Sequence, residues 1–206
     1  MVFGDRGRVA VADPAGDRLS VLSLDEVCAL PLEDDSAAVS AAFTGDDELL
    51  AVVDGALQRV DLRRGELIAT ARPHSAQTLA VGAGPLGETT LGAELDGTYT
   101  LRTSGAVVAL PGRPPPSPQL RATRCGWLVE LWSGLALVGA TGAIVQLRLP
   151  PLRDGGRPIL GGRRVVAAGD RVVLACQPPL APYVYRLRDL TFEARLEPEA
   201  ERDQPA

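Results

Sequence analysis

The sequence contains no lysine and no asparagine among its 206 residues. Without lysine, a Schiff-base enzyme, a lysine nucleophile and a phosphate-binding loop of the Walker type are excluded. Without asparagine there is no N-glycosylation site. The single histidine, His74, excludes a metal site built on two histidines. Three separated cysteines with no C-x-x-C pair do not make a disulfide framework, and they favour buried thiols in a reducing compartment.

Long apolar runs and aromatic residues are also scarce. No run approaches the roughly 18 apolar residues that a membrane-spanning helix needs. Asp5, Arg6 and Arg8 interrupt the N-terminal region, so we expect no signal peptide and a soluble cytoplasmic protein. The bias toward Ala, Gly, Arg and Pro favours a GC-rich bacterial genome. Aromatic residues make up 4% and the net charge is −5, which together argue against a nucleic-acid-binding protein.

Short segments of alternating polarity dominate the rest of the chain. Typical segments are Glu48–Val53, Ala56–Leu62, Arg171–Cys176 and Tyr183–Arg188, and Gly, Asp and Pro separate such segments from one another. Period-two alternation over five to seven residues is typical of half-buried strands, and no longer segment has a convincing helical period. The sequence therefore predicts an all-β protein.

The turns between these strands recur at regular intervals. A turn between the third and fourth strands of a unit recurs about every 40 residues, at Asp25-Glu26, Arg64-Gly65, Ser104-Gly105, Thr141-Gly142 and Asp189-Leu190. An earlier turn recurs at Gly16, Gly55, Gly97 and Gly134. Asp54-Gly55 and Asp96-Gly97 are both predicted to form type I′ hairpin turns. Four-stranded units of about 40–45 residues are typical of β-propeller blades.

We therefore predict one small β-propeller over residues 1–196, with about five four-stranded repeats. The predicted repeats span approximately 1–37, 38–75, 76–112, 119–150 and 160–196. The acidic tail 197–206 is predicted to be disordered. The first repeat lacks most of its innermost strand, because Met1–Phe3 aligns with the end of the opening strand of the second repeat. Either Met1–Phe3 suffices as a short strand, or a partner chain completes this repeat.

One stretch resembles a known repeat family. Residues 54–70 resemble the closing half of a WD-repeat or YVTN-type propeller blade, with Val60-Asp61 where the family has Trp-Asp. Pro73-His74 resembles the Gly-His element that opens the next blade, and the close resemblance covers residues 39–81. It implies a structural hydrogen bond between His74 and Asp96. It also implies a protein-interaction role, and one candidate setting is an ATPase-containing bacterial complex.

Other motifs indicate structure more than chemistry. Gly82–Gly87 fits G-x-G-x-x-G, but a dinucleotide fingerprint needs a helix next and residues 88–95 are β-patterned. We therefore interpret this segment as a wide hairpin loop. The acidic runs 33–35 and 46–48 lack calcium-loop spacing, no nucleophile is marked near His74, and Cys125 and Cys176 are predicted to be buried. We predict no catalytic residue, no cofactor and no metal.

The charge is unevenly distributed along the chain. Residues 1–109 hold 8 arginines and 17 acidic residues, whereas residues 110–190 hold 11 arginines and 4 acidic residues. Arginine pairs carboxylates and phosphates through a planar fork. A partner-binding sector is therefore predicted around the loops that join the fourth and fifth repeats, at Arg121, Arg124, Arg148, Arg153, Arg157, Arg163 and Arg164.

The sequence thus favours a non-catalytic interaction subunit of a bacterial multiprotein complex, which docks other protein subunits through the propeller face and this arginine sector. Two alternatives stay open. One is a propeller hydrolase or lyase with a carboxylate site at the mouth of the channel. The other is a propeller that binds a small anionic ligand.

Overall fold

The computed structural model describes residues 2–3, 9–12, 18–22, 27–31, 38–71, 77–115, 118–148, 153–154, 157–158, 164–175 and 182–196. These residues form strands and turns and contain no helix. It follows that these ranges hold no helix with the length and hydropathy needed to cross a bilayer. The all-β prediction is confirmed for the described part of the chain.

Five antiparallel sheets of four strands follow one another in chain order. The first sheet comprises β1 (Val2–Phe3), β2 (Val9–Ala12), β3 (Arg18–Leu22) and β4 (Val27–Pro31). The second comprises β5 (Ala38–Phe43), β6 (Glu48–Val53), β7 (Ala56–Asp61) and β8 (Glu66–Ala71). The third comprises β9 (Gln77–Gly84), β10 (Gly87–Ala93), β11 (Tyr99–Arg102) and β12 (Val107–Ala109).

The fourth sheet comprises β13 (Leu120–Thr123), β14 (Gly126–Leu131), β15 (Gly134–Val138) and β16 (Ile144–Arg148). The fifth comprises β19 (Arg164–Ala168), β20 (Arg171–Ala175), β21 (Tyr183–Arg186) and β22 (Phe192–Arg195). A two-stranded ribbon lies between them in the chain, formed by β17 (Arg153–Asp154) and β18 (Arg157–Pro158). Repeated four-stranded sheets of this kind fit a β-propeller-like repeat.

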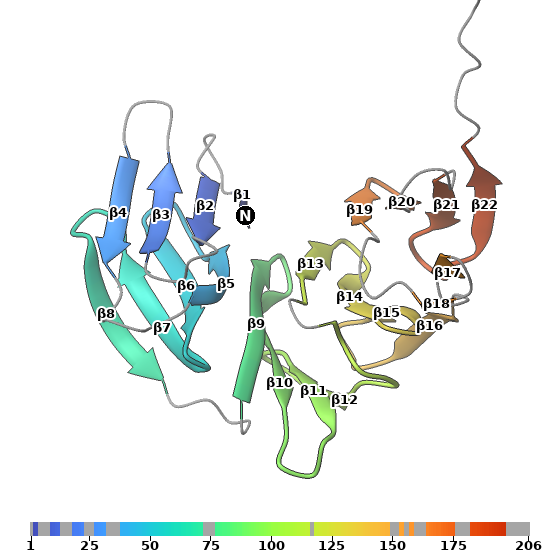
Figure 1. Cartoon of the computed structure of the whole chain (residues 1–206), viewed down its shortest axis with the longest axis horizontal. Helices are drawn as coiled ribbons and strands as arrows, with labels where there is room; N and C mark the ends of the chain where they lie inside the picture. Colours follow the sequence, from blue (N-terminus) through green and yellow to red (C-terminus); the bar gives the residue numbers. More distant parts are fainter. Residues whose placement is uncertain are drawn as a thin grey trace, which may run out of the picture.

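Consecutive sheets lie next to one another along an arc (Figure 1). In each sheet the first strand lies toward the inside of the arc and the fourth lies toward its outside. Strand β5 contacts β1 and β2, β9 contacts β5 to β7, and β13 contacts β9. The first and fifth sheets are the two ends of the arc, which is open between them in this view.

Apolar side chains fill the spaces between neighbouring sheets. Leu50 and Val52 of the second sheet pack against Val81 of the third. Leu91 and Leu101 of the third sheet pack against residues of the fourth, among them Trp127. A last cluster joins the fourth and fifth sheets through residues that include Leu128, Leu135, Val172, Leu174 and Tyr185. The core therefore consists of layers between neighbouring sheets. This follows from strand geometry, because successive side chains point to opposite faces of a sheet and each buried face packs against the next sheet.

A partly buried ion pair also joins the second and third sheets. Arg59 of β7 donates to both carboxylate oxygens of Glu88 on β10, at 2.7 and 2.8 Å, and it also pairs with Glu48 on β6. Nη2 of Arg59 makes both contacts with Glu88 while Nη1 pairs with Glu48, so one guanidinium links two carboxylates through different nitrogens.

One of the two predicted type I′ turns is confirmed and the other is wrong. Asp54 and Gly55 have φ of 50° and 76°, as a type I′ turn requires. In the second turn only Gly97 has positive φ, 81°. The Gly97 N–H donates to the Glu94 carbonyl, and the Glu94 N–H donates to Thr98 across a three-residue loop. A local contact stabilises this three-residue loop, because the Asp96 carboxylate accepts a hydrogen bond from the Thr98 N–H at 2.9 Å.

The wide loop predicted at Gly82–Gly87 is also wrong. Gly84 pairs directly with Gly87, so only Pro85 and Leu86 form the turn between β9 and β10. A Cβ atom on Gly82 would lie 2.5 Å from Cζ3 of Trp127, and one on Gly84 would lie 2.3 Å from Cβ of Ala122. The two glycines therefore make room for the fourth sheet, and no phosphate is needed to explain them.

The first sheet has four strands although its first strand has two residues. Val2 pairs with Ala10 and Phe3 with Val9, so β1 occupies the position that the first strand holds in the other sheets. The sequence left open whether Met1–Phe3 suffices as a strand. A short β1 is present, and it covers only part of the four-residue β2 beside it.

Candidate functional site: an arginine pocket on the fifth sheet

The tight hairpin turn between β19 and β20 forms one side of the site. Ala168 pairs with Arg171, so Gly169 and Asp170 alone form the turn between β19 and β20, and Gly169 has φ of 55°. The Asp170 carbonyl accepts a hydrogen bond from the Leu187 N–H at 2.7 Å. Because Leu187 is fully buried, this bond holds the turn against the end of β21.

The loop between β21 and β22 forms the opposite side of the site. The Arg186 N–H donates to the Thr191 carbonyl at 2.8 Å, and the Asp189 carboxylate accepts from the Thr191 N–H at 3.1 Å. Leu190 has φ of 53°, an uncommon value for leucine, and its side chain is buried in the cluster between the fourth and fifth sheets. Burial of this leucine therefore fixes the loop that carries Arg188 and Asp189.

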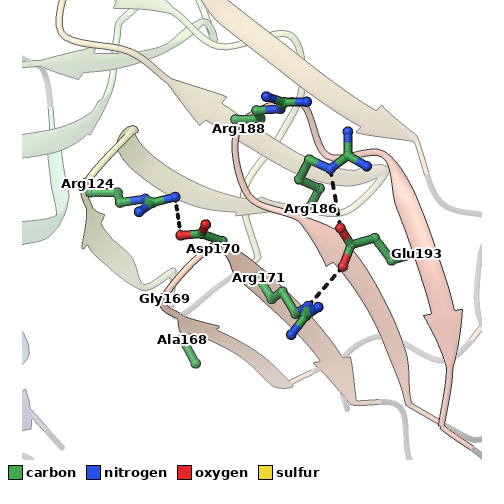
Figure 2. Close-up of a pocket in the computed structure, with 8 residues that line it drawn as sticks. All are labelled: Arg124, Ala168, Gly169, Asp170, Arg171, Arg186, Arg188 and Glu193. Atoms are coloured by element: carbon green, nitrogen blue, oxygen red, sulfur yellow. Dashed lines mark hydrogen bonds and ion pairs between the residues drawn. The ribbon is translucent and has the colours of Figure 1, made fainter.

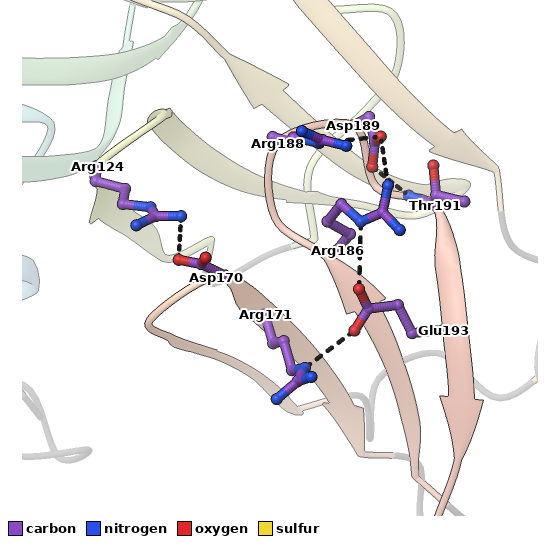
Figure 3. Close-up of polar contacts among 8 residues, drawn as sticks. All are labelled: Arg124, Asp170, Arg171, Arg186, Arg188, Asp189, Thr191 and Glu193. Atoms are coloured by element: carbon purple, nitrogen blue, oxygen red, sulfur yellow. Dashed lines mark hydrogen bonds and ion pairs between the residues drawn. The ribbon is translucent and has the colours of Figure 1, made fainter.

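Charged side chains from these turns form a network (Figure 3). Glu193 of β22 accepts from Nε of Arg171 at 3.0 Å and from Nε of Arg186 at 3.3 Å. Asp189 lies 3.6 Å from both Arg186 and Arg188. Arg124, from the turn between β13 and β14 of the fourth sheet, pairs with Asp170. The network thus joins two sheets that are adjacent in the fold.

Hydrogen bonding changes the acidity of two of these carboxyl groups. The hydrogen bond from Arg171 lowers the pKa of Glu193, and the bond from Arg186 adds to this effect. For Asp189, partial desolvation acts to raise the pKa, but hydrogen bonds from Thr191 and the charges of Arg186 and Arg188 outweigh it and lower the pKa. Both groups are therefore ionised at neutral pH.

The network surrounds a pocket of about 670 Å³ (Figure 2). Its described lining consists of Arg124, Ala168, Gly169, Asp170, Arg171, Arg186, Arg188 and Glu193. The four arginines keep 39–71% of their side-chain surface exposed. A guanidinium has five N–H donors, so one that already pairs with a carboxylate retains donors for a ligand. The pocket is therefore suited to bind anionic groups.

Two carboxylates, those of Asp170 and Glu193, are the acid–base groups of the described lining besides its arginines. The described lining holds no hydroxyl, thiol or imidazole that could serve as a nucleophile or general base. A carboxyl acting as a general acid near neutral pH needs a raised pKa, whereas that of Glu193 is lowered. Within the described residues we find no group of three or more His, Cys, Asp or Glu side chains that could hold a metal ion.

Among the described residues of the predicted arginine sector, Arg124 lines this pocket. Arg121 lies on β13, where it donates to Gln119 at 2.5 Å and burial lowers its pKa against the opposing charge of Glu130. Arg148 is exposed at the end of β16. The side chains of Arg153, Arg157 and Arg164, and all of Arg163, lie outside the described residues.

Sequence reasoning missed the other three arginines. Arg171 begins β20 and Arg186 ends β21, and the two residues pair across the ladder. The predicted strands Arg171–Cys176 and Tyr183–Arg188 already brought these arginines to one end of a hairpin. The antiparallel pairing of these two predicted strands could therefore have indicated that Arg171 and Arg186 lie side by side.

The structure describes Asp96, one of the two residues for which a structural hydrogen bond was predicted. The predicted partner of Asp96, His74, lies outside the described residues. Asp96 accepts from both the backbone N–H and the hydroxyl of Thr98, and this bonding lowers its pKa. Cys125 was predicted to be buried but is only half-buried, because it follows Arg124 in the β13–β14 turn.

The lowered pKa of Glu193 predicts a pH effect. Because its folded pKa lies below the ordinary value, Glu193 stabilises the fold above that value, and this stabilisation is lost as the pH falls through the lowered pKa. Arg171→Ala should move the Glu193 pKa up toward the ordinary value, measured by carboxyl NMR titration. The matched variant Arg63→Ala, which removes an exposed arginine of the second sheet, should leave it unchanged. An equal pKa in all three proteins would contradict the assigned hydrogen bond.

Comparison with known proteins bears on the fold alone. No protein-family model matches the chain, and no curated protein is significantly similar in sequence. The chain is similar in structure to a protein of unknown function from Bacteroides caccae, with a TM-score of 0.61 and 15% identity over 92% of this chain and 72% of that one. It is also similar to U3-55K, with a TM-score of 0.66 and 14% identity over 95% of this chain. It spans 65% of the U3-55K chain, just under two thirds.

Proposed function

We propose that this chain is a non-catalytic interaction subunit of a bacterial, cytoplasmic multiprotein complex, and that it docks an acidic partner protein at the arginine pocket. The observation that carries the proposal is the convergence of Arg124, Arg171, Arg186 and Arg188 on one open cavity. Exposed arginines that present several donors steer and orient acidic partners, because charge complementarity raises the association rate and fixes the register.

The proposed scaffold is a β-propeller of five repeats with WD-repeat-like blades. Support comes from the five four-stranded sheets, from their order along the arc, and from the first strand of each lying on the inside (Figure 1). Propeller blades present turns and loops on one face, and such rigidly held turns are common binding surfaces. The pocket is built from three such turns, which fits a docking role.

We further propose that a partner completes the first repeat. Strand β1 pairs over two residues, whereas the first strand of the second sheet has six. A strand added by a partner could extend the pairing of the first sheet beyond these two residues. Subunits of an ATPase-containing complex remain one candidate source of that partner.

A small anionic ligand is the second candidate, and one observation favours it. The pocket volume of about 670 Å³ lies within the range of roughly 300–1,000 Å³ that small-molecule sites occupy. Such a ligand would use the same arginines. Affinity capture distinguishes the two candidates, because the chain would retain a protein only if its ligand is a partner protein.

Affinity capture with charge-reversal variants tests the proposal. Arg171→Glu combined with Arg188→Glu should reduce the retained partner at least about tenfold, because charge-assisted hydrogen bonds are lost and repulsion is added. Arg63→Glu is the matched control, since Arg63 is 77% exposed and also pairs with a carboxylate, Asp47. Arg163→Glu with Arg164→Glu tests the predicted sector beside the pocket. Equal retention by the pocket variant and the control would refute docking at this site.

A further inference from the structure

Several residues that line the pocket lie on one face of the fifth sheet. Side chains alternate along β20, so Val172 and Leu174 point into the cluster shared with the fourth sheet while Arg171 and Val173 point the other way. On β21, Tyr185 belongs to the same cluster, and Arg186 follows it on the opposite face. We call this opposite side of the fifth sheet its outward face.

An aliphatic surface adjoins the arginines on the outward face. Val165 of β19 is buried in the cluster with the fourth sheet, so Val166 and Ala168 lie on the other side. Val166 is 50% exposed, and Ala168 is exposed and lines the pocket. A ligand seated between the guanidinium groups would therefore reach exposed aliphatic surface two residues along β19.

The charge pattern of the pocket restricts the anion. The described lining carries four arginines and two carboxylates, so its formal charge is +2. Asp170 and Glu193 alternate with the arginines and would repel a dense polyanion such as a polyphosphate. Sites for phosphate usually also supply a helix N-terminus or a nest of backbone N–H groups. The described lining includes no helix and no aromatic ring for base stacking.

We infer that the arginine pocket binds an extended acidic segment of a partner protein, with two carboxylates at alternate positions and an aliphatic side chain beyond them. Residues i and i+2 of an extended chain project to the same side about 7 Å apart, so two carboxylates can enter one pocket together. Two carboxylates neutralise the charge of +2, and the aliphatic side chain covers Val166. This inference rests on the proposed docking function and specifies its partner.

Fluorescence anisotropy with the full chain tests the inference. The probe is a labelled, terminally blocked peptide Glu-Ala-Glu-Ala-Val, and the control is the same peptide with glutamine for glutamate. We expect the glutamine peptide to bind at least about tenfold more weakly, because two charge-assisted hydrogen-bonded contacts are lost. Arg171→Glu with Arg188→Glu should weaken the glutamate peptide by a similar factor, and Arg63→Glu should not.

Two competitors and one further variant separate the possible ligands. Inorganic phosphate and a short oligothymidylate should displace the peptide poorly, and tighter binding of either would overturn the inference. Val166→Ser should weaken binding of the glutamate peptide and leave the affinity for a Glu-Ala-Glu peptide, which lacks the valine, unchanged. Equal binding of the glutamate and glutamine peptides, or no binding of either, would also overturn it. If the charge-reversal variant loses its captured partner while the peptide fails to bind, the docking function stands and only the peptide assignment falls.

Discussion

Replacing Trp127 with alanine is expected to lower the free energy of unfolding by about 3–5 kcal/mol, the usual cost of removing a large buried aromatic side chain. Trp127 is 1% exposed and lies in the cluster that joins the third and fourth sheets. Trp127→Phe should cost less, because Nε1 of Trp127 is buried with no hydrogen-bond partner among the described residues. Urea unfolding monitored by circular dichroism measures both differences.

A double-mutant cycle with Gly82 makes the prediction specific. Gly82→Ala alone should destabilise the protein by about 1–3 kcal/mol, since the added methyl group would lie 2.5 Å from the Trp127 ring. In the Trp127→Ala background the two shortest contacts of this methyl group are gone and the contact with Cβ of Leu120, at 3.1 Å, remains, so most of its cost should disappear. Additive effects would show that the glycine has another role and would reopen the interpretation of Gly82–Gly87.

Replacing Gly126 with alanine is expected to cost about 3 kcal/mol or more, because backbone strain and a steric clash act together. Gly126 has φ of 147°, and a Cβ atom there would lie 2.2 Å from the Val138 carbonyl oxygen. Its own carbonyl also accepts a hydrogen bond from the buried Thr123 hydroxyl at 2.7 Å. The backbone must therefore move at the start of β14, where it pairs with β13 and β15.

Gly105 provides the matched control for this substitution. It lies in a turn of the third sheet, with open space around the position of a Cβ atom and no positive φ. Gly105→Ala should change the free energy of unfolding by no more than about 0.5 kcal/mol. Comparable losses for Gly105→Ala and Gly126→Ala would contradict the packing described around β14.

The sequence predicted most strands because local pattern determines them. Glu48–Val53 was predicted to the residue, and the turns at Gly55 and Gly142 lie where the spacing put them, since glycine adopts positive φ without steric cost. The prediction for Asp96-Gly97 was wrong because an Asp-Gly pair occurs both in two-residue type I′ turns and in three-residue loops. The hydrogen bond from the Thr98 N–H to Asp96 favours the three-residue loop, and the Asp-Gly pair alone does not reveal that bond.

Contacts between sheets could not be read from the same pattern. Gly82 and Trp127 are 45 positions apart in the sequence, and only packing of the third sheet on the fourth brings them together. The candidate site shows the same limit. The charge distribution pointed to residues 110–190, which contain all four pocket arginines, but the sequence singled out only Arg124 among them. Their convergence depends on the register of three hairpins and on the contact between two sheets.

The most direct test of the docking role is the affinity of the purified partner for three forms of the full chain, measured by titration calorimetry at low ionic strength. The forms are the unaltered protein, Arg171→Glu with Arg188→Glu, and the control Arg63→Glu. We predict that the pocket variant binds at least about tenfold more weakly while the control binds as the unaltered protein does. Equal affinity for all three, with unchanged melting temperatures, would contradict docking at the arginine pocket.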